Sequence, residues 1–134
     1  MNSIREINLD VDHPVLSVWW EAHGWPVVPR AILPKLGVMA MAGDLRVAAG
    51  FLYMDNSVGV SMLEWLVTNP DATGRQSLAA IGAVIGFLSE RALEMDYGVM
   101  LTSCRQQGLA RIFEHHGFAK TDEGIIHMVR KLRE

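Results

Sequence analysis

The sequence predicts a single α/β (α+β) domain with a mixed, mostly antiparallel sheet of six to seven strands and helices on both faces. Three apolar runs, 36–43, 45–55 and 58–68, follow one another with only short turns between them, which is typical of an antiparallel meander. The run 74–95 has apolar residues at three- and four-residue steps, as one buried helix face requires. A length of 134 residues fits one domain, expected to cover 1–134.

The elements before the meander are a strand and a helix. Residues 3–10 alternate around apolar positions and predict the first strand. Residues 12–14 read Asp-His-Pro and predict a helix start, because proline is favoured near the first helical position; that helix ends near Gly24. Three prolines between 26 and 34 leave room for at most a short helix.

After the meander, the helix 74–95 leads to a strand over 97–104, and this crossover should be parallel and right-handed. A second amphipathic helix covers 106–117 and ends at Gly117, a residue suited to a left-handed terminator. Residues 118–121 and 125–132 predict a closing hairpin. The buried face of the long helix is expected to contain Leu78, Ile81, Ile85, Leu88 and Ala92.

Composition excludes several classes of partner. The net charge is −3, so we expect no binding to nucleic acid or to an anionic membrane. The longest apolar or glycine run, over residues 78–88, has eleven residues and cannot span a bilayer. A single cysteine and a start without a secretion pattern lead us to expect a cytoplasmic protein. The histidines lack ligand spacing, so no metal site is expected.

Two stretches, together with the order of elements, resemble the Gcn5-related N-acetyltransferase (GNAT) family over residues 3–132. "LEWLVTNP" resembles the family's fourth strand, with Glu64 six residues before Pro70. "LARIFEHHGF" resembles its late helix-to-strand segment, with Phe113 followed by Gly117 and Phe118. The resemblance implies acetyl-coenzyme A (acetyl-CoA) as co-substrate, lying in an opening between 63–68 and 99–103.

The resemblance also implies which residues touch that co-substrate. The family's pyrophosphate loop falls on Thr73, Gln76 and Leu78 here, so its usual glycines are missing. A helix start still offers free amides and a partial positive charge. Thr73 and Gln76 alternatively form a capping box that occupies two of those amides. The implied cofactor-binding residues are Leu66, Val67, Thr68, Thr73, Gly74, Arg75, Gln76, Ser77, Gln106 and Phe113.

Glu64 is the candidate catalytic residue. A protonated amine needs a base, and Glu64 can serve through a water if its side chain faces the opening; otherwise it is a lone carboxylate on the outer face of a strand. The family's proton-donating tyrosine is replaced by Phe113, which cannot donate, so a slow enzyme is expected.

The acceptor side is predicted from an aromatic cluster. Three tryptophans lie within residues 19–25, where the family's first helix and following loop receive the acceptor. Aromatic rings beside a carboxylate suit a cationic or peptide-like amine. The candidate substrate residues are Trp20, His23 and Trp25; alternatively Trp19 is core and the others form a rim or a dimer contact.

Two functions therefore stay open. The first is an acetyl-CoA-dependent N-acetyltransferase that acts on a small-molecule or peptide amine by direct transfer. The alternative is a non-catalytic binding or assembly module with the same fold, which the altered loop and Phe113 favour. A relative that uses a different acyl thioester is a third, more remote reading, and a homodimer remains open.

Overall fold

The computed structural model describes residues 2–133, which form two compact units, 2–103 and 104–133. The first unit contains a five-stranded sheet in the order β1-β2-β3-β4-β5. Its strands are β1 (Asn2–Glu6), β2 (Gly37–Ala42), β3 (Leu45–Met54), β4 (Val60–Thr68) and β5 (Val99–Thr102). Neighbouring strands are antiparallel from β1 to β4, and β4 pairs with β5 in parallel, as the crossover predicts.

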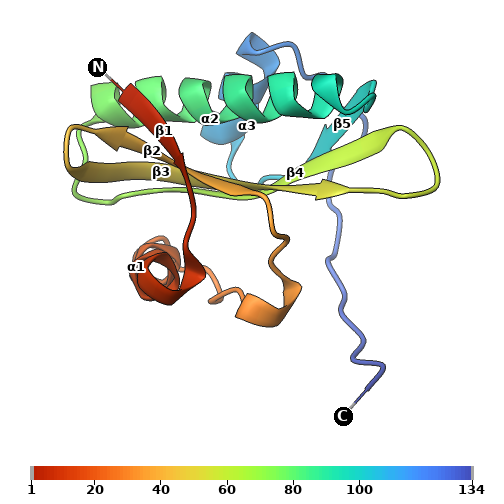
Figure 1. Cartoon of the computed structure of the whole chain (residues 1–134), viewed down its shortest axis with the longest axis horizontal. Helices are drawn as coiled ribbons and strands as arrows, with labels where there is room; N and C mark the ends of the chain where they lie inside the picture. The colour runs from red at the N-terminus through yellow and green to blue at the C-terminus, as the bar shows by residue number, and fades with distance from the viewer. Residues whose placement is uncertain (1, 134) are drawn as a thin grey trace. The chain divides into compact units, whose positions relative to one another are not determined.

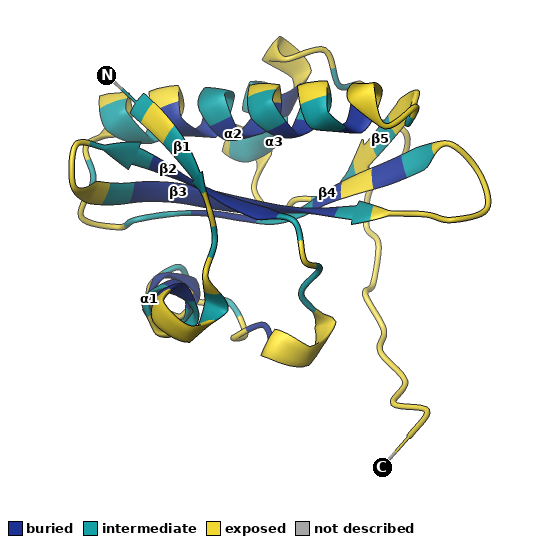
Figure 2. Cartoon of the chain, viewed as in Figure 1, coloured by how far each residue is buried: buried dark blue, intermediate teal, exposed yellow. Residues whose placement is uncertain are grey.

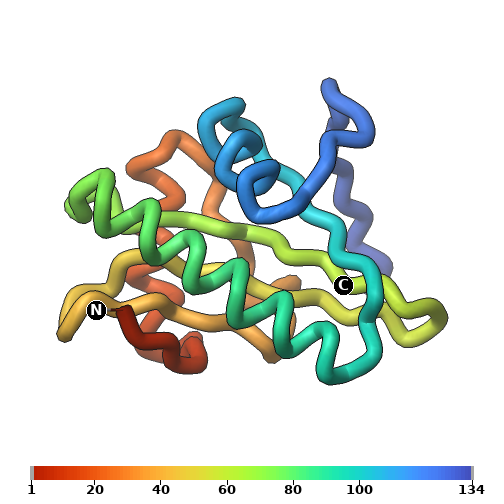
Figure 3. Tube along the Cα trace, turned by 90° about the horizontal axis from the view of Figure 1, so that it is seen from above, coloured from red at the N-terminus to blue at the C-terminus, as the bar shows by residue number. Residues whose placement is uncertain are grey.

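Helices cover both faces of this sheet, as expected. Helix α2 (Gly74–Glu94) lies on one face, and α1 (Leu9–Ala22) with the short 3₁₀ helix η1 (Arg30–Ile32) lies on the other (Figure 1). From above, α2 runs back along the sheet from the end of β4 toward the start of β5 (Figure 3). Among residues 2–133, no helix combines the length and apolar character needed to cross a membrane.

Each face has its own core. The α2 face buries the predicted helical stripe, except that Leu78 is 56% exposed. On the other face, α1 packs on the sheet through a second cluster, and burial is deepest in the first part of β2 and the middle of β3 (Figure 2). The members of this second cluster are Leu16, Trp19, Trp20, Val28, Met39, Ala49, Phe51 and Val67.

The start of α1 differs from the prediction. The helix begins at Leu9 because Asn8 caps it: the Asn8 side chain accepts a hydrogen bond from the amide of Asp10. Pro14 consequently lies inside the helix. Asp12, expected at the helix start, is fully buried in the first turn and pairs with arginines.

The second unit contains α3 (Gln107–His115), which ends before Gly117 at a φ of +96°, as predicted. The predicted closing hairpin is wrong: residues 118–133 contain no strand, so the described sheet has five strands rather than six or seven. A turn does occur at Gly124, with a φ of +72°. The arm 118–121 is short, and an isolated two-stranded hairpin is only marginally stable in water.

Candidate active site

Strands β4 and β5 part at the middle of β4. Their paired positions run from Val60 and Val99 to Leu63 and Thr102. The Thr102 hydroxyl closes the pairing by donating a 2.6 Å hydrogen bond to the Leu63 carbonyl. Beyond this point β4 continues to Thr68 while β5 has ended. Residues 64–68 of β4 therefore have no paired residue in the described part of β5. The sequence predicts an opening at this place.

A β-bulge lies in the same stretch of β4, opposite β3. Ala49 faces Val67 and Phe51 faces Glu64, so Gly50 alone faces two residues, Trp65 and Leu66. Trp65 has a φ of +61°, a left-handed conformation that non-glycine residues rarely adopt. Such a bulge leaves a residue unpaired and re-aims the strand, and strained backbone of this kind is often found at functional sites. The sequence analysis missed it.

The bulge is held by a chain of side-chain hydrogen bonds. The indole N–H of Trp65 donates to the Tyr53 hydroxyl at 2.8 Å, and that hydroxyl donates to the Ile32 carbonyl. Burial raises the pKa of the Tyr53 phenol; the Trp65 hydrogen bond opposes this rise, and the charge of Glu64 adds to it. The strand register places both residues on one face of the sheet, because Phe51 pairs with Glu64 and Tyr53 pairs with Met62.

Glu64 is half-buried where the strands part. Its carboxylate accepts a 2.7 Å hydrogen bond from the hydroxyl of Ser103, the residue directly after β5. It faces Phe51 across the ladder, and Phe51 belongs to the core under α1. Because paired residues point to the same face, Glu64 points toward the α1 side. Ser103 was absent from the predicted set because a lone serine after a strand carries no sequence signal.

The start of α2 contains the expected capping box. The Thr73 hydroxyl accepts from the Gln76 amide at 3.1 Å, and the Gln76 side chain accepts from the Thr73 amide at 3.0 Å. The Ser77 amide makes the first helical bond, to the Thr73 carbonyl. The amides of Gly74 and Arg75 remain, since the first helical residues have no partner within the helix. The capping box is thus confirmed, whereas a ligand at the amides of Gly74 and Arg75 stays a prediction.

The side chains around this turn leave it accessible. Leu78 is 56% exposed and points away from the core. Gly74 has open space on the side where other residues carry a Cβ atom. Leu66 and Val67 are buried, at 8% and 2% exposure, so only their backbone groups are available to a ligand.

The predicted acceptor residues separate. His23 and Trp25 stack with ring centroids 4.7 Å apart, and the His23 ring donates from Nε2 to the Thr68 carbonyl at 3.0 Å. This contact joins the end of α1 to the end of β4. Trp20, by contrast, is 1% exposed and packs in the core, on the inward face of α1 next to the buried Trp19, so it has almost no surface to offer a substrate. Its role toward a substrate stays a prediction.

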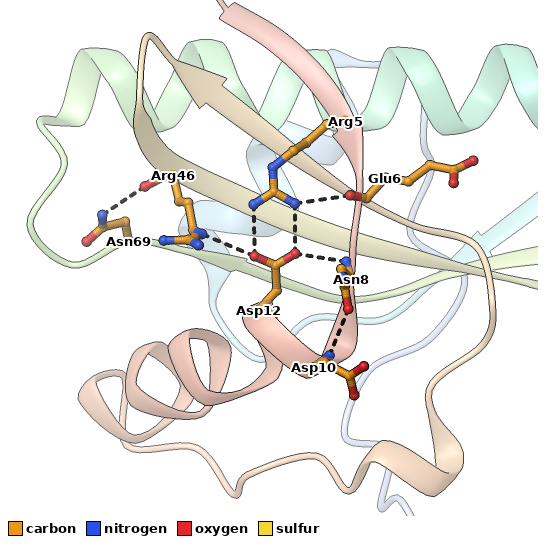
Figure 4. Close-up of polar contacts among 7 residues, drawn as sticks. All are labelled: Arg5, Glu6, Asn8, Asp10, Asp12, Arg46 and Asn69. Atoms are coloured by element: carbon orange, nitrogen blue, oxygen red, sulfur yellow. Dashed lines mark hydrogen bonds and ion pairs between the residues drawn. The ribbon is translucent and has the colours of Figure 1, made fainter.

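A buried ion network anchors the first turn of α1 near the same loop (Figure 4). The Asp12 carboxylate accepts two hydrogen bonds from Arg5, at 2.7 and 2.8 Å, and one from Arg46 at 3.1 Å. The Arg5 hydrogen bonds hold the pKa of Asp12 below its usual value. The carbonyl of Arg46 accepts from the Asn69 side chain at 2.8 Å, which ties the loop after β4 to β3.

The second unit contains two further predicted residues. Gln106 is exposed and precedes α3 without a side-chain capping bond, and Phe113 is buried against Phe118 with ring centroids 5.0 Å apart. Their roles toward a cofactor stay predictions.

Other parts of the described chain offer less. Two surface hollows have volumes of about 390 and 330 Å³. The first is lined by residues 7–9, 33–35 and Phe51, the second by residues 55–59, Asp96 and Tyr97, and none of the predicted site residues lines either. Residues 2–133 contain no group of histidine, cysteine or acidic side chains placed to hold a metal ion.

Comparison with known proteins gives a consistent picture of the fold. No protein-family model and no curated protein sequence matches the chain. Among solved structures, the chain is similar to the ribosomal-protein-S18-alanine N-acetyltransferase from Escherichia coli, with a TM-score of 0.74, 16% identity and coverage of 91% of this chain and 80% of that one. A transcriptional regulator from Bacillus halodurans C-125 has a TM-score of 0.73, 17% identity and coverage of 96% and 100%.

A GNAT-family acetyltransferase from Streptococcus pneumoniae TIGR4 is similar at a TM-score of 0.63 and 16% identity, over 98% of this chain and 100% of that one. At such identities the likeness concerns architecture. The chain therefore has the fold of the Gcn5-related N-acetyltransferases.

Proposed function

We propose that this protein is an acetyl-CoA-dependent N-acetyltransferase that acts on an amine. The observation that carries the proposal is the parting of β4 and β5 after Leu63 and Thr102, with a bulge at Trp65 and a carboxylate, Glu64, at the same point. In the acetyltransferase fold this is where an acyl donor and an amine would meet.

The residues present fit the acyl donor in part. The amides of Gly74 and Arg75, the positive end of the α2 dipole and the Arg75 guanidinium suit a pyrophosphate. The backbone of Leu66–Thr68, without a β5 partner in the described chain, suits an extended arm lying along the strand. When bound, acetyl-CoA supplies the acetyl group as a thioester.

Glu64 is placed to act on the amine. In direct transfer the amine nitrogen bonds to the acetyl carbon, the carbon–sulfur bond breaks, and the sulfur leaves with its electron pair. The proton that the amine must lose passes to Glu64 through a water, and Ser103 keeps the carboxylate in place. A thiol of pKa about 8.5 leaves acceptably as the thiolate near neutral pH, so the replacement at Phe113 slows the reaction without stopping it.

The capping box favours the alternative of a non-catalytic module. Thr73 and Gln76 satisfy one another's amides, so two of the amides at this turn are occupied without a ligand. Such a module would keep the fold for binding or assembly and would release no CoA.

Two measurements separate these functions. Acetyl-CoA at 100 times its dissociation constant should stabilise the folded protein by about 2.7 kcal/mol, read from thermal unfolding. CoA release from a mixture of primary amines then reports turnover. Stabilisation with amine-dependent CoA release supports the enzyme; neither effect with acetyl-CoA or longer acyl-CoA esters contradicts it and leaves the module.

A further inference from the structure

We infer that the acceptor is a primary amine carrying an apolar alkyl or aryl group, which lies on an exposed shelf formed by Val60, Met62, Val99 and Leu101. This inference rests on the proposed function and names the substrate class for the same site.

The shelf follows from the strand register. Val60 pairs with Val99 and Met62 with Leu101, so the four side chains share one face of the β4–β5 pair. Met62, Val99 and Leu101 are 40%, 52% and 50% exposed. The alternate positions, Ser61 and Leu63, are fully buried on the opposite face. An apolar surface therefore remains open where the strands pair, directly before they part.

The shelf is continuous with the proposed catalytic carboxylate. Tyr53 faces Met62 and Phe51 faces Glu64 across the β3–β4 ladder, which places Met62 and Glu64 on the same face, two residues apart. That spacing corresponds to about 7 Å along the strand. An amine held near Glu64 would thus place a chain of roughly four to six carbons over Met62 and Leu101.

Charge complementarity selects the kind of amine. Glu64 supplies a negative group for one ammonium, whereas the four shelf residues supply no charge. A second ammonium at the far end of a diamine would gain no charged partner from the four shelf side chains. An apolar tail instead removes exposed apolar surface from water.

The test compares acceptors and shelf variants by acetyl-CoA-dependent CoA release. We expect kcat/KM for n-hexylamine and 2-phenylethylamine to exceed that for 1,4-diaminobutane by about tenfold or more. Met62→Gln and Leu101→Gln should raise KM for n-hexylamine about fivefold and leave methylamine, which is too short to reach the shelf, unchanged. Leu93→Gln, at a 69% exposed position of α2, is the matched control and should change neither. Leu101→Met should retain the wild-type preference.

The remaining outcomes are equally decisive. The substrate class is overturned if kcat/KM for 1,4-diaminobutane equals or exceeds that for n-hexylamine. It is also overturned if the shelf variants, with normal melting temperatures, raise KM for methylamine as much as for n-hexylamine. In both cases CoA release still supports the acetyltransferase. No stabilisation by acetyl-CoA and no CoA release from any amine overturns both. A short peptide with an apolar second residue that outcompetes n-hexylamine supports the inference and identifies the apolar amine as a peptide N-terminus.

Discussion

The Ser103 hydroxyl donates a 2.7 Å hydrogen bond to the Glu64 carboxylate across the point where β5 ends and β4 continues. The two residues are 39 positions apart in the chain, and the α2 crossover brings them together. This contact fixes a carboxylate on the α1 side of the sheet, where the proposed chemistry requires it.

Glu64→Gln should lower kcat by about 10²- to 10⁴-fold, because the amide cannot accept the amine proton. Stabilisation by acetyl-CoA should stay unchanged, since Glu64 does not belong to the helix start. Ser103→Ala should cause a smaller loss, of about threefold to tenfold, because it removes one hydrogen bond that positions the carboxylate. Ser17→Ala, which removes a hydroxyl bonded to the His13 carbonyl, is the control. Equal loss of activity and of acetyl-CoA stabilisation in Glu64→Gln would make Glu64 a structural residue.

Arg75→Ala should weaken acetyl-CoA binding by about tenfold, through loss of a cation at the start of α2. Titration calorimetry at low and moderate salt measures the change, and the difference should shrink as salt rises. Arg91→Ala removes a cation from the other end of the same helix and should leave the dissociation constant alone. Identical behaviour of the two variants would argue against a pyrophosphate at this turn.

Asp12→Asn should destabilise the protein by about 2 kcal/mol, because it breaks an ion pair whose carboxylate is fully buried and whose arginines are partly exposed. The pKa of Asp12 is lowered in the folded state, so the stabilisation is fully present above its unfolded value of about 4 and is lost as the pH falls below it. Urea unfolding of the wild type should therefore show falling stability below about pH 4, with a flatter profile in Asp12→Asn. Parallel profiles for the two proteins would show that another carboxyl group dominates acid unfolding.

Trp65→Gly should be more stable than Trp65→Ala by about 1 kcal/mol, because position 65 has a positive φ that glycine adopts without strain. In an ordinary strand the order is reversed, since glycine is the poorer strand residue. Both variants lose the indole and its hydrogen bond to Tyr53, so the comparison isolates the backbone. Denaturant unfolding measures the free energy of unfolding of both variants. If Trp65→Ala is as stable as Trp65→Gly, position 65 does not have a positive φ.

Gly50→Ala should cost about 1–3 kcal/mol, because the added methyl group would lie 2.7 Å from Cγ1 of Val84 on α2. Gly86→Ala is the matched substitution, in an exposed helical position with open space around it. It should stabilise the protein by about 1 kcal/mol through helix propensity. A neutral Gly50→Ala would show that α2 lies farther from β3 than the structure places it.

The sequence predicted the elements whose signal is periodic or depends on a single residue type. The buried face of α2, the β2–β4 meander, the capping box at Thr73 and Gln76 and the terminator at Gly117 all follow from local chemistry. The bulge could not be predicted in this way, because Trp65 is apolar and "LEWLV" reads as an uninterrupted strand. Its trace is a spacing of three between the buried Leu63 and Leu66, where an unbroken strand would alternate in steps of two.

Two other expectations fit the structure less well, for physical reasons. Trp20 is expected on the acceptor side because the first helix of the resembled family and the loop after it receive the acceptor, whereas in the structure both adjacent rings, Trp19 and Trp20, are buried in the core. The hairpin over 118–132 was predicted from apolar residues that are exposed in the structure, including Ile126 at 82% and Met128 at 88%. Strand formation depends on a neighbouring strand, which a local pattern does not supply.

Arg46 serves two segments at once: its side chain bonds to Asp12 of α1, and its carbonyl receives the Asn69 side chain. The helix expected to receive the amine and the loop expected to hold the nucleotide end of the donor are thereby fastened to one residue of β3. A substitution at Arg46 would therefore disturb both the helix and the loop. We expect changes of acceptor to arise more easily through residues at the edge of the sheet than through residues in the first turn of α1.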